Sequence, residues 1–320
     1  MVLKKILIAL LVIVMGLQLC ACDAEPTEPT TEEKTVTVGL CLRQQADAPE
    51  YYDAIVAALK NAGYGVIVED SKNDQSRQDQ QLRGLLATGC EMLVVEPVMV
   101  TALESVVEQA KKSEVPLLLI DREPDAAILA SYQELYYVGC QSAEAGTAQA
   151  GILEHMNLKG DLNEDGVVSY MMLRGPEDHM DAQLISEGCN LALTKYETDL
   201  ICTVTTQWDT ESARADCAQG LSQFGRDIEV IFCNHALLAA GAVQAVENRG
   251  WMPGQDIYIV AVDSNAALQA LIQKGAVFGT VSAQPQKRAQ VITQTVSSVL
   301  LGEKPEKCTY VPYELVTAQP

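Results

Sequence analysis

The stretch MLVVEPVMVTALESVVEQAKKSEVPLLLID at 92–121 decides the fold. Residues 92–97 and 115–121 are almost continuously apolar, which is typical of strands covered by helices on both faces. Residues 102–112 between them are expected to form a helix. A strand, a helix and a second strand in this order predict a βαβ unit with parallel strands.

The same alternation runs outward in both directions. On the amino-terminal side, strands are predicted at 35–42 and 64–70, and helices at 51–62 and 74–87. The strands predicted on the other side lie at 135–140, 167–173, 200–206, 228–233, 256–262 and 278–282. The helices that alternate with them lie at 143–156, 181–194, 212–224, 237–248, 266–274 and 285–301. The pattern predicts an α/β fold with two doubly wound parallel-sheet domains.

The chain begins with a secretory signal. In MVLKKILIALLVIVMGLQLCAC two lysines precede an apolar run from 6 to 19. The final L-C-A-C resembles a bacterial lipobox, which predicts a signal peptide at 1–21 and lipidation of Cys22. There are two alternatives: the segment is not cleaved and serves as a membrane anchor, or the lipid is attached to Cys20. Residues 22–34 carry Pro, Thr and Glu with no large apolar residue, so they are expected to form a disordered tether. The body is therefore expected to be extracytoplasmic and held at the membrane.

Composition excludes several classes of function. The chain has 43 acidic and 22 basic residues, a net charge of −21, and so would repel nucleic acid. Only three histidines are present and H-E-x-x-H is absent, which argues against a zinc hydrolase. G-x-S-x-G, the P-loop and G-x-G-x-x-G are also absent. We expect a monomer that binds no nucleic acid and is not an enzyme.

Eight cysteines remain after Cys20 and Cys22. A secreted chain with eight cysteines could form disulfides. However, Cys41, Cys202 and Cys233 lie in apolar strands, C-x-x-C is absent, and a body of this size needs no cross-links. We expect mostly free, buried thiols.

The segment DLNEDGVVS at 161–169 has the composition of a cation-binding loop. Its candidate ligands are Asp161, Asn163, Asp165, Ser169 and the carbonyl of Val167. Gly166 permits the sharp turn, and the start matches the EF-hand pattern D-x-[DN]-x-[DN]-G. The twelfth position is Met172 instead of the usual glutamate, so a bidentate acid must come from elsewhere. The sequence predicts a Ca²⁺ site; the alternative is a polar surface turn.

Polar and aromatic residues follow many of the predicted strands. They are Asp47, Asp121, His179, Asp181, Trp208, His235 and Asp263. In open parallel sheets, ligands bind beyond the carboxyl ends of the strands. Carboxylates that accept hydroxyl hydrogens, together with an indole face, indicate a sugar site. A single such residue, for example Asp263, could instead cap the helix that follows it.

Several longer motifs carry a family resemblance. They are DSKNDQSRQDQQLRGLL at 70–86, REPDAA at 122–127, SYQELYYVGCQS at 131–142, DLNEDG at 161–166, HMDA at 179–182, QWDT at 207–210, GAVQAV at 241–246 and VPYE at 311–314. With these motifs, 36–314 resembles the ribose-type periplasmic sugar-binding family. The resemblance implies an N-terminal lobe of 35–140 plus 284–311, and a C-terminal lobe of 141–283 plus 312–320 that contains the calcium loop. It also implies three hinge crossings near 140–141, 283–284 and 311–312, about which the lobes close on a ligand.

The resemblance assigns roles to individual residues. His179, Asp181, Trp208 and Asp263 match sugar contacts of galactose- and glucose-binding members, and Asp47 matches an acid. Tyr51 or Tyr52 is the implied stacking residue, and Glu229 is implied as the missing bidentate calcium ligand. The departures from the family pattern are Asp121 and His235 in place of asparagines, Ala236 in place of an aspartate, Ile185 in place of an arginine, and Ala283 in place of an asparagine. Such changes are expected to alter the sugar preference or to weaken binding, and the alternative is a degenerate pocket in a protein kept for sensing.

The sequence therefore predicts a lipid-anchored extracytoplasmic protein that binds a galactose- or glucose-like monosaccharide and feeds an ABC importer through its permease. The alternative is a sugar-sensing subunit for a chemosensory or kinase receptor. A transcription repressor of the same architecture is disfavoured, because a signal peptide takes the place of its N-terminal DNA-binding helices.

Overall fold

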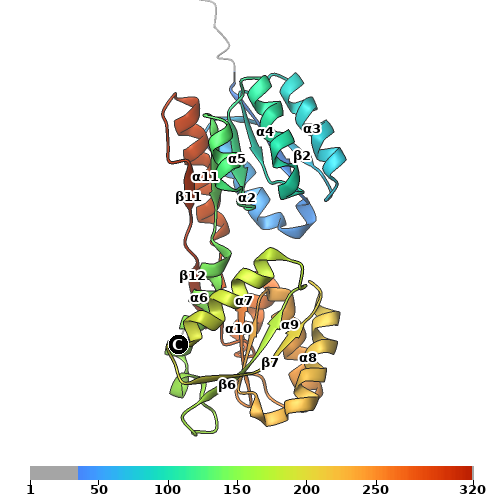
Figure 1. The fold of residues 1–320 in the computed structure, drawn as a ribbon, viewed down its shortest axis with the longest axis vertical. Coiled ribbons are helices and arrows are strands. Elements are labelled where there is room, and N and C mark those ends of the chain that lie inside the picture. Colours follow the sequence, from blue (N-terminus) through green and yellow to red (C-terminus); the bar gives the residue numbers. More distant parts are fainter. Residues whose placement is uncertain (1–34, 319–320) are drawn as a thin grey trace, which may run out of the picture. The chain divides into compact units, whose positions relative to one another are not determined.

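The computed structural model describes residues 35–318, which form two six-stranded sheets with helices on both faces of each (Figure 1). The predicted α/β fold with two doubly wound sheets is confirmed. The predicted signal peptide at 1–21, the tether at 22–34 and the lipidation site at Cys22 lie outside the described residues. Within 35–318, no helix is long and apolar enough to cross a bilayer.

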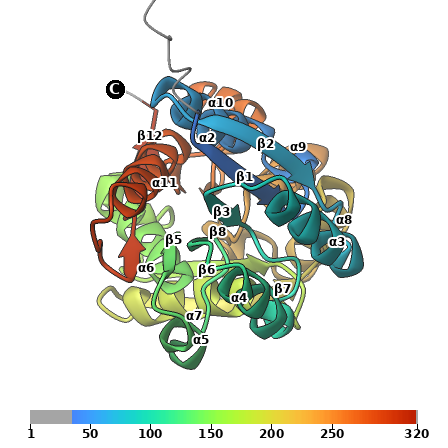
Figure 2. The same ribbon diagram turned by 90° about the horizontal axis from the view of Figure 1, so that it is seen from above.

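The first sheet has the strand order β11-β5-β4-β3-β1-β2, and all its pairs are parallel. Its strands are β1 (Thr37–Leu42), β2 (Gly65–Asp70), β3 (Met92–Val95), β4 (Leu117–Ile120), β5 (Leu135–Gly139) and β11 (Cys308–Tyr310). Its helices are α2 (Pro49–Asn61), α3 (Gln75–Ala87), α4 (Leu103–Lys112), α5 (Ala126–Ser131) and α11 (Pro285–Leu300). One core lies under α2 and α11, and another lies on the opposite face under α3 and α4 (Figure 2).

The second sheet has the order β12-β10-β9-β8-β6-β7. Its strands are β6 (Val168–Arg174), β7 (Thr198–Thr205), β8 (Val230–Cys233), β9 (Tyr258–Val262), β10 (Gly279–Ser282) and β12 (Glu314–Thr317). Its helices are α6 (Ser142–Gly151), α7 (Met180–Leu193), α8 (Thr210–Phe224), α9 (Ala236–Asn248) and α10 (Ala266–Gln273). β12 pairs antiparallel with β10, which departs from the all-parallel prediction. A short link joins β11 of the first sheet to β12. β12 therefore enters the second sheet in the direction opposite to β10.

Three segments connect the two sheets, and they contact one another. The first leaves β5 and enters α6, the second leaves β10 and enters α11, and the third joins β11 to β12. The thiol of Cys140 lies 3.8 Å from the carbonyl oxygen of Ala283. Gln284, which has a left-handed φ of +50°, donates from Nε2 to the carbonyl of Pro312 at 2.6 Å. The second connection therefore contacts both of the others.

The eight cysteines within 35–318 are all free thiols, in agreement with the prediction. Cys202 of β7 and Cys233 of β8 lie in the apolar core of the second sheet with Cys217 of α8. Burial is the main cause that raises the pKa of the Cys217 thiol to about 12. Thiols of this kind act as small apolar side chains.

Two glycines permit α6 and α7 to pack closely. A Cβ on Gly146 would lie 1.9 Å from the carbonyl oxygen of Ile185, and one on Gly188 would lie 2.2 Å from that of Ala143. Each helix thus presents a glycine to the backbone of the other. This contact fixes α7, whose N-cap residue is His179 and whose first turn carries Asp181.

We expect Gly146→Ala to lower the free energy of unfolding by about 1–3 kcal/mol or more, because a backbone atom cannot yield to the added methyl group. Gly84→Ala in α3 is the matched control, since a Cβ there meets nothing within 4 Å. The control should be neutral or stabilising by up to about 1 kcal/mol. Urea unfolding of both variants provides the measurement. Equal midpoints would show that the helices separate without cost.

Candidate functional site

The strand order of each sheet reverses next to its first strand in the chain. In the first sheet β1 lies between β2 and β3, and in the second β6 lies between β7 and β8. Ligands of doubly wound folds bind outside the carboxyl ends of the strands at this reversal. The structure places most of the predicted sugar-site residues at these ends, in two groups.

The first group is built around Asp121, directly after β4. Arg288, in the first turn of α11, forms an ion pair with its Oδ1, and the Tyr51 hydroxyl donates to the same oxygen at 3.3 Å. The guanidinium carbon of Arg288 lies 4.0 Å from the centre of the Tyr51 ring. Burial raises the pKa of Asp121 to about 6, although the positive charge of Arg288 opposes that rise. Burial also disfavours the charge of Arg288, but Asp121 more than compensates, and the pKa of Arg288 is raised.

A second buried acid, Glu96, lies directly after β3. Its Oε2 accepts from the Tyr52 hydroxyl at 2.5 Å, and its Oε1 accepts from Arg43 Nε at 3.2 Å. Arg122 donates to the carbonyl of Val98 at 2.8 Å, and burial, followed by the charge of Arg43, lowers its pKa. Both tyrosines considered as stacking residues are thus buried and donate to carboxylates.

Sequence reasoning missed Arg43, Glu96, Arg122 and Arg288. A signal for three of them was present, since Arg43, Glu96 and Arg122 follow β1, β3 and β4 in the same way as Asp121 does. Arg288 does not follow a strand, so there was no reason to select it from the sequence. It lies in α11, and its contact with Asp121 depends on the tertiary fold.

The second group is built around Trp208, which follows β7. The rings of His179 and His235 both meet the indole edge to face, with centroids at 5.3 Å and 5.5 Å. Gly175 supports the indole, since a Cβ there would lie 2.2 Å from Trp208 Cη2. The structure therefore brings together three residues that the sequence predicted separately, from the ends of β6, β7 and β8.

Each histidine of this group has a carboxylate nearby. His179 Nδ1 lies 3.8 Å from Asp181 Oδ2, and His235 Nε2 lies 3.9 Å from Asp263 Oδ2. The hydroxyl of Ser142 donates to Asp181 Oδ1 at 2.7 Å. The alternating acids, imidazoles and indole offer donors, acceptors and an aromatic surface within one region, which suits a polyol.

The remaining predicted positions have simpler surroundings. Asp47 ends a short 3-10 helix, Gln45–Asp47, just before α2. Ile185 and Ala236 are core residues of the second lobe, 6% and 2% exposed. Ala283 is 7% exposed and belongs to the second connection between the sheets. At 185 and 236 the side chains therefore pack in the apolar core.

Glu229, the residue before β8, contacts the candidate cation loop. Its Oε1 accepts from the backbone N–H groups of Leu162 and Asn163 at 2.7 Å and 3.0 Å, and its Oε2 accepts from that of Ser169 at 2.8 Å. The side chain is buried, with the residue 2% exposed. A buried carboxylate with backbone donors on both oxygens joins two segments that lie 60 residues apart in the chain.

Within the loop, some carboxylate oxygens accept hydrogen bonds from the backbone N–H groups of the loop. Asp161 Oδ2 accepts from Gly166 N at 2.9 Å, and Asp165 Oδ1 accepts from Val167 N at 2.9 Å. Asp161 Oδ1 is buried without a hydrogen-bond partner. No three His, Cys, Asp or Glu side chains within 35–318 are grouped as metal ligands. Thus one buried oxygen of Asp161 is available to a cation, whereas both oxygens of Glu229 accept backbone N–H groups in this structure.

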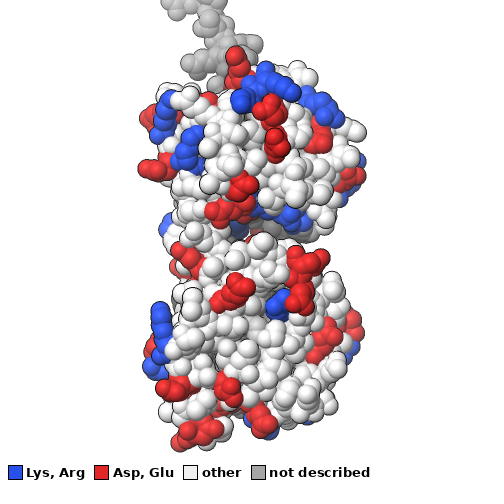
Figure 3. All heavy atoms as spheres, viewed as in Figure 1, with Lys and Arg blue, Asp and Glu red and all other residues white. Residues whose placement is uncertain are grey.

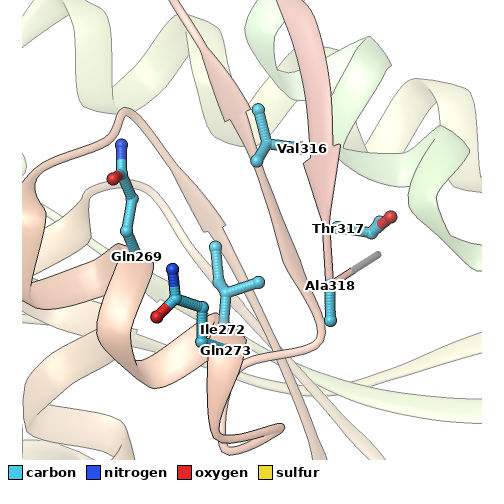
Figure 4. A pocket seen from close by; sticks show the side chains of 6 residues that line it. All are labelled: Gln269, Ile272, Gln273, Val316, Thr317 and Ala318. Atoms are coloured by element: carbon cyan, nitrogen blue, oxygen red, sulfur yellow. The ribbon is translucent and has the colours of Figure 1, made fainter. Parts of the chain in front are cut away.

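A cavity of about 390 Å³ lies elsewhere on the second lobe (Figure 4). It is lined by Gln269, Ile272 and Gln273 of α10 and by Val316, Thr317 and Ala318. Val316 and Thr317 pair with the first residues of β10, so this cavity is at the amino end of that strand. It is therefore separate from the strand ends that carry the candidate site.

On the face in Figure 3, acidic and basic side chains are interspersed without a continuous basic patch.

A family model described as "Periplasmic binding protein domain" matches residues 46–304. The chain belongs to the periplasmic binding protein family. The match includes strands of both sheets and the groups around Asp121 and Trp208. Membership in a family of binding proteins agrees with the prediction that the chain is not an enzyme.

Curated relatives cover most of the chain. The D-galactose/methyl-galactoside binding periplasmic protein MglB of Haemophilus influenzae is 28% identical over 247 residues, which are 75% of this chain and 73% of that protein. The ribose import binding protein RbsB of Bacillus subtilis is 26% identical over 317 residues, which are 93% of this chain and 94% of that protein.

Solved structures share the fold. The binding protein of an arabinose ABC transporter from a Shewanella species has a TM-score of 0.75 and 21% identity, and the match covers 88% of this chain and 91% of that one. A solute-binding protein from Actinobacillus succinogenes with bound D-allose has a TM-score of 0.77 and 19% identity, over 89% of this chain and 98% of that one. At these identities the likeness shows the fold.

Proposed function

We propose that this protein binds a monosaccharide outside the cytoplasm and delivers it to an ABC importer. The observation that carries the proposal is the group around Trp208, with two imidazoles against its indole and a carboxylate beside each. Such a group suits a hydroxylated ring, which is apolar on its faces and polar at its edge. The relatives named for galactose and ribose support a sugar of this size.

The proposed ligand residues are the predicted Asp47, Tyr51, Asp121, His179, Asp181, Trp208, His235 and Asp263. Arg122 joins them, because it lies directly after Asp121 and makes a single side-chain hydrogen bond among the described residues. Asp121 and Tyr51 are already engaged with Arg288, so they are expected to shape this wall of the site. Closure of the lobes about the three connections would favour the ligand-bound state.

The two tryptophans of the chain give a direct test. Trp208 lies in the proposed site, whereas Trp251 packs between Arg226 and Arg249, whose guanidinium carbons lie 4.3 Å and 4.8 Å from its ring centre. A thermal-shift panel of galactose, glucose, ribose and arabinose would identify a ligand, since ligand at a hundred times Kd adds about 2.7 kcal/mol of stability. That sugar should change the fluorescence of the wild type.

The fluorescence change should survive in Trp251→Phe. In Trp208→Phe it should disappear, and the affinity should fall at least about tenfold, or about 1.4 kcal/mol. If Trp208→Phe retains both the signal and the affinity, the sugar binds elsewhere.

We also propose that the loop at 161–169 and Glu229 hold a Ca²⁺ ion. The proposed ligands are Asp161, Asn163, Asp165, Ser169, the Val167 carbonyl and Glu229. The unpartnered buried oxygen of Asp161 and the approach of Glu229 to the loop support this assignment. A hard cation with oxygen ligands from two segments would cross-link them.

Calcium should therefore raise the melting temperature of the wild type after EDTA treatment, with or without sugar. Glu229→Gln and Asp165→Asn should each abolish that rise, because each removes a charged ligand. Glu197→Gln is the matched control: Glu197 is exposed, and its backbone pairs with Val168 beside the loop. A rise that persists in both Glu229→Gln and Asp165→Asn would refute the site.

We further propose that a lipid on Cys22 anchors the protein, on the strength of the L-C-A-C motif. Cys22→Ala should move the protein from the membrane fraction to the medium or periplasm, because one lost anchor removes its main membrane contact. Cys20→Ala is the control and should leave the protein with the membrane. The reverse result would assign the lipid to Cys20.

A further inference from the structure

The second connection between the sheets has few backbone torsions that can rotate. Ser282 ends β10 and pairs with β12, so it is held to the second sheet. On the other side α11 packs in a core of the first sheet, and Pro285 at its start has its φ fixed by the ring. The backbone N–H of Arg288 donates to the Gln284 carbonyl at 2.9 Å, which closes the first turn of α11. Rotation within this connection therefore falls on Ala283 and Gln284.

Gln284 has a backbone conformation that its residue type avoids. Its φ of +50° and ψ of +63° lie in the left-handed region, where a Cβ crowds the backbone. A residue before proline is also restricted to extended conformations, and Gln284 precedes Pro285. Within 35–318, it is the only non-glycine residue with a positive φ that is followed by proline. Strain is thus stored at the point about which the connection rotates.

Two hydrogen bonds hold Gln284 in this conformation. Its backbone N–H donates to Ser282 Oγ at 3.1 Å, and its Nε2 donates to the carbonyl of Pro312 at 2.6 Å. Pro312 belongs to the third connection, which is tied to the first because the Val311 N–H donates to the Gly139 carbonyl at 2.8 Å. A rotation at Gln284 would move its side chain away from Pro312.

We infer that Gln284 is a latch that sets the balance between two arrangements of the lobes. In one arrangement its backbone is left-handed and its amide is bonded to Pro312, and in the other the rotated hinge has lost both features. The backbone strain favours leaving the first arrangement, whereas the hydrogen bond favours keeping it.

The latch would act on ligand binding from the hinge. The apparent Kd of a ligand depends on the population of the arrangement that binds it. A residue that shifts this population therefore changes the affinity through the hinge. The inference rests on the proposed sugar-binding function, and it adds that Gln284 tunes the affinity for the sugar.

Urea unfolding of Gln284→Gly and Gln284→Ala tests the strain. Both variants remove the amide, but glycine adopts a left-handed backbone without strain. We expect the higher midpoint for Gln284→Gly. Gln286→Gly and Gln286→Ala are the matched pair, because Gln286 is exposed on α11 and alanine should be the more stable residue there. A higher midpoint for Gln284→Ala than for Gln284→Gly would overturn the latch.

Calorimetric titration with the sugar of the panel that binds best tests the effect on affinity. The Kd values of Gln284→Gly and Gln284→Ala should differ at least about fivefold, because only alanine is penalised in the left-handed arrangement. The tighter binder of the two identifies the arrangement that binds sugar. Gln284→Met keeps the length of the side chain without its donor, and its Kd should differ from that of the wild type at least about threefold.

The two Gln286 variants should bind the sugar with equal Kd. If the two small variants of Gln284 also bind it equally, the backbone is left-handed in both arrangements, so the latch is wrong and the proposed function stands. If Gln284→Met binds as the wild type does, the bond to Pro312 does not distinguish the arrangements, and the latch is again wrong. If no sugar binds the wild type, the proposed function fails and the latch fails with it.

Discussion

Parallel pairing of the strands is the constraint on which the site depends. It aligns the carboxyl ends of strands that are far apart in the chain, so the residues that follow them meet at one edge. In the second sheet, Leu173 of β6 pairs with Cys233 of β8, and the loops just beyond carry His179 and His235. Both imidazoles consequently reach the indole of Trp208, which follows the neighbouring β7.

The two ends of the second sheet have different roles. At the amino end, Glu229 precedes β8 and accepts three backbone hydrogen bonds from the residues that lead into β6. These bonds tie β8 to the loop at 161–169 and compensate for burial of the carboxylate. At the carboxyl end, the acids lie beside histidines and are more exposed. The amino end of the sheet thus carries a buried, fully bonded carboxylate, whereas the acids at the carboxyl end are accessible to a ligand of the kind we propose.

The first sheet carries charges that neutralise one another. Asp121 pairs with Arg288, and Glu96 pairs with Arg43, so each buried acid has a guanidinium beside it. Tyr51 and Tyr52 donate one hydroxyl to each acid. Removal of either arginine would leave a buried carboxylate without its counter-charge. In the proposed site this group would form one wall, beside Arg122, whose Nη1 donates to the Val98 carbonyl.

The periodic apolar strands predicted the fold class and most elements, because burial on both faces requires continuous apolar runs. Short elements such as α5, β11 and β12 were missed, since a few residues carry too little periodicity. The strand-end rule also selected His179, Trp208, His235 and Asp263, which the structure brings together. It missed Arg288, whose partner Asp121 lies 167 residues away in the chain.

The sequence by itself determined that two mainly parallel sheets form and which polar residues follow their strands, because both depend on local pattern. Only the tertiary structure decided how those residues face one another. The meeting of both imidazoles with Trp208, the contact of Glu229 with the loop at 161–169, and the pairing of Asp121 with Arg288 all arise from helix and strand packing. Specificity depends on distances of a few tenths of an ångström, which no local pattern encodes.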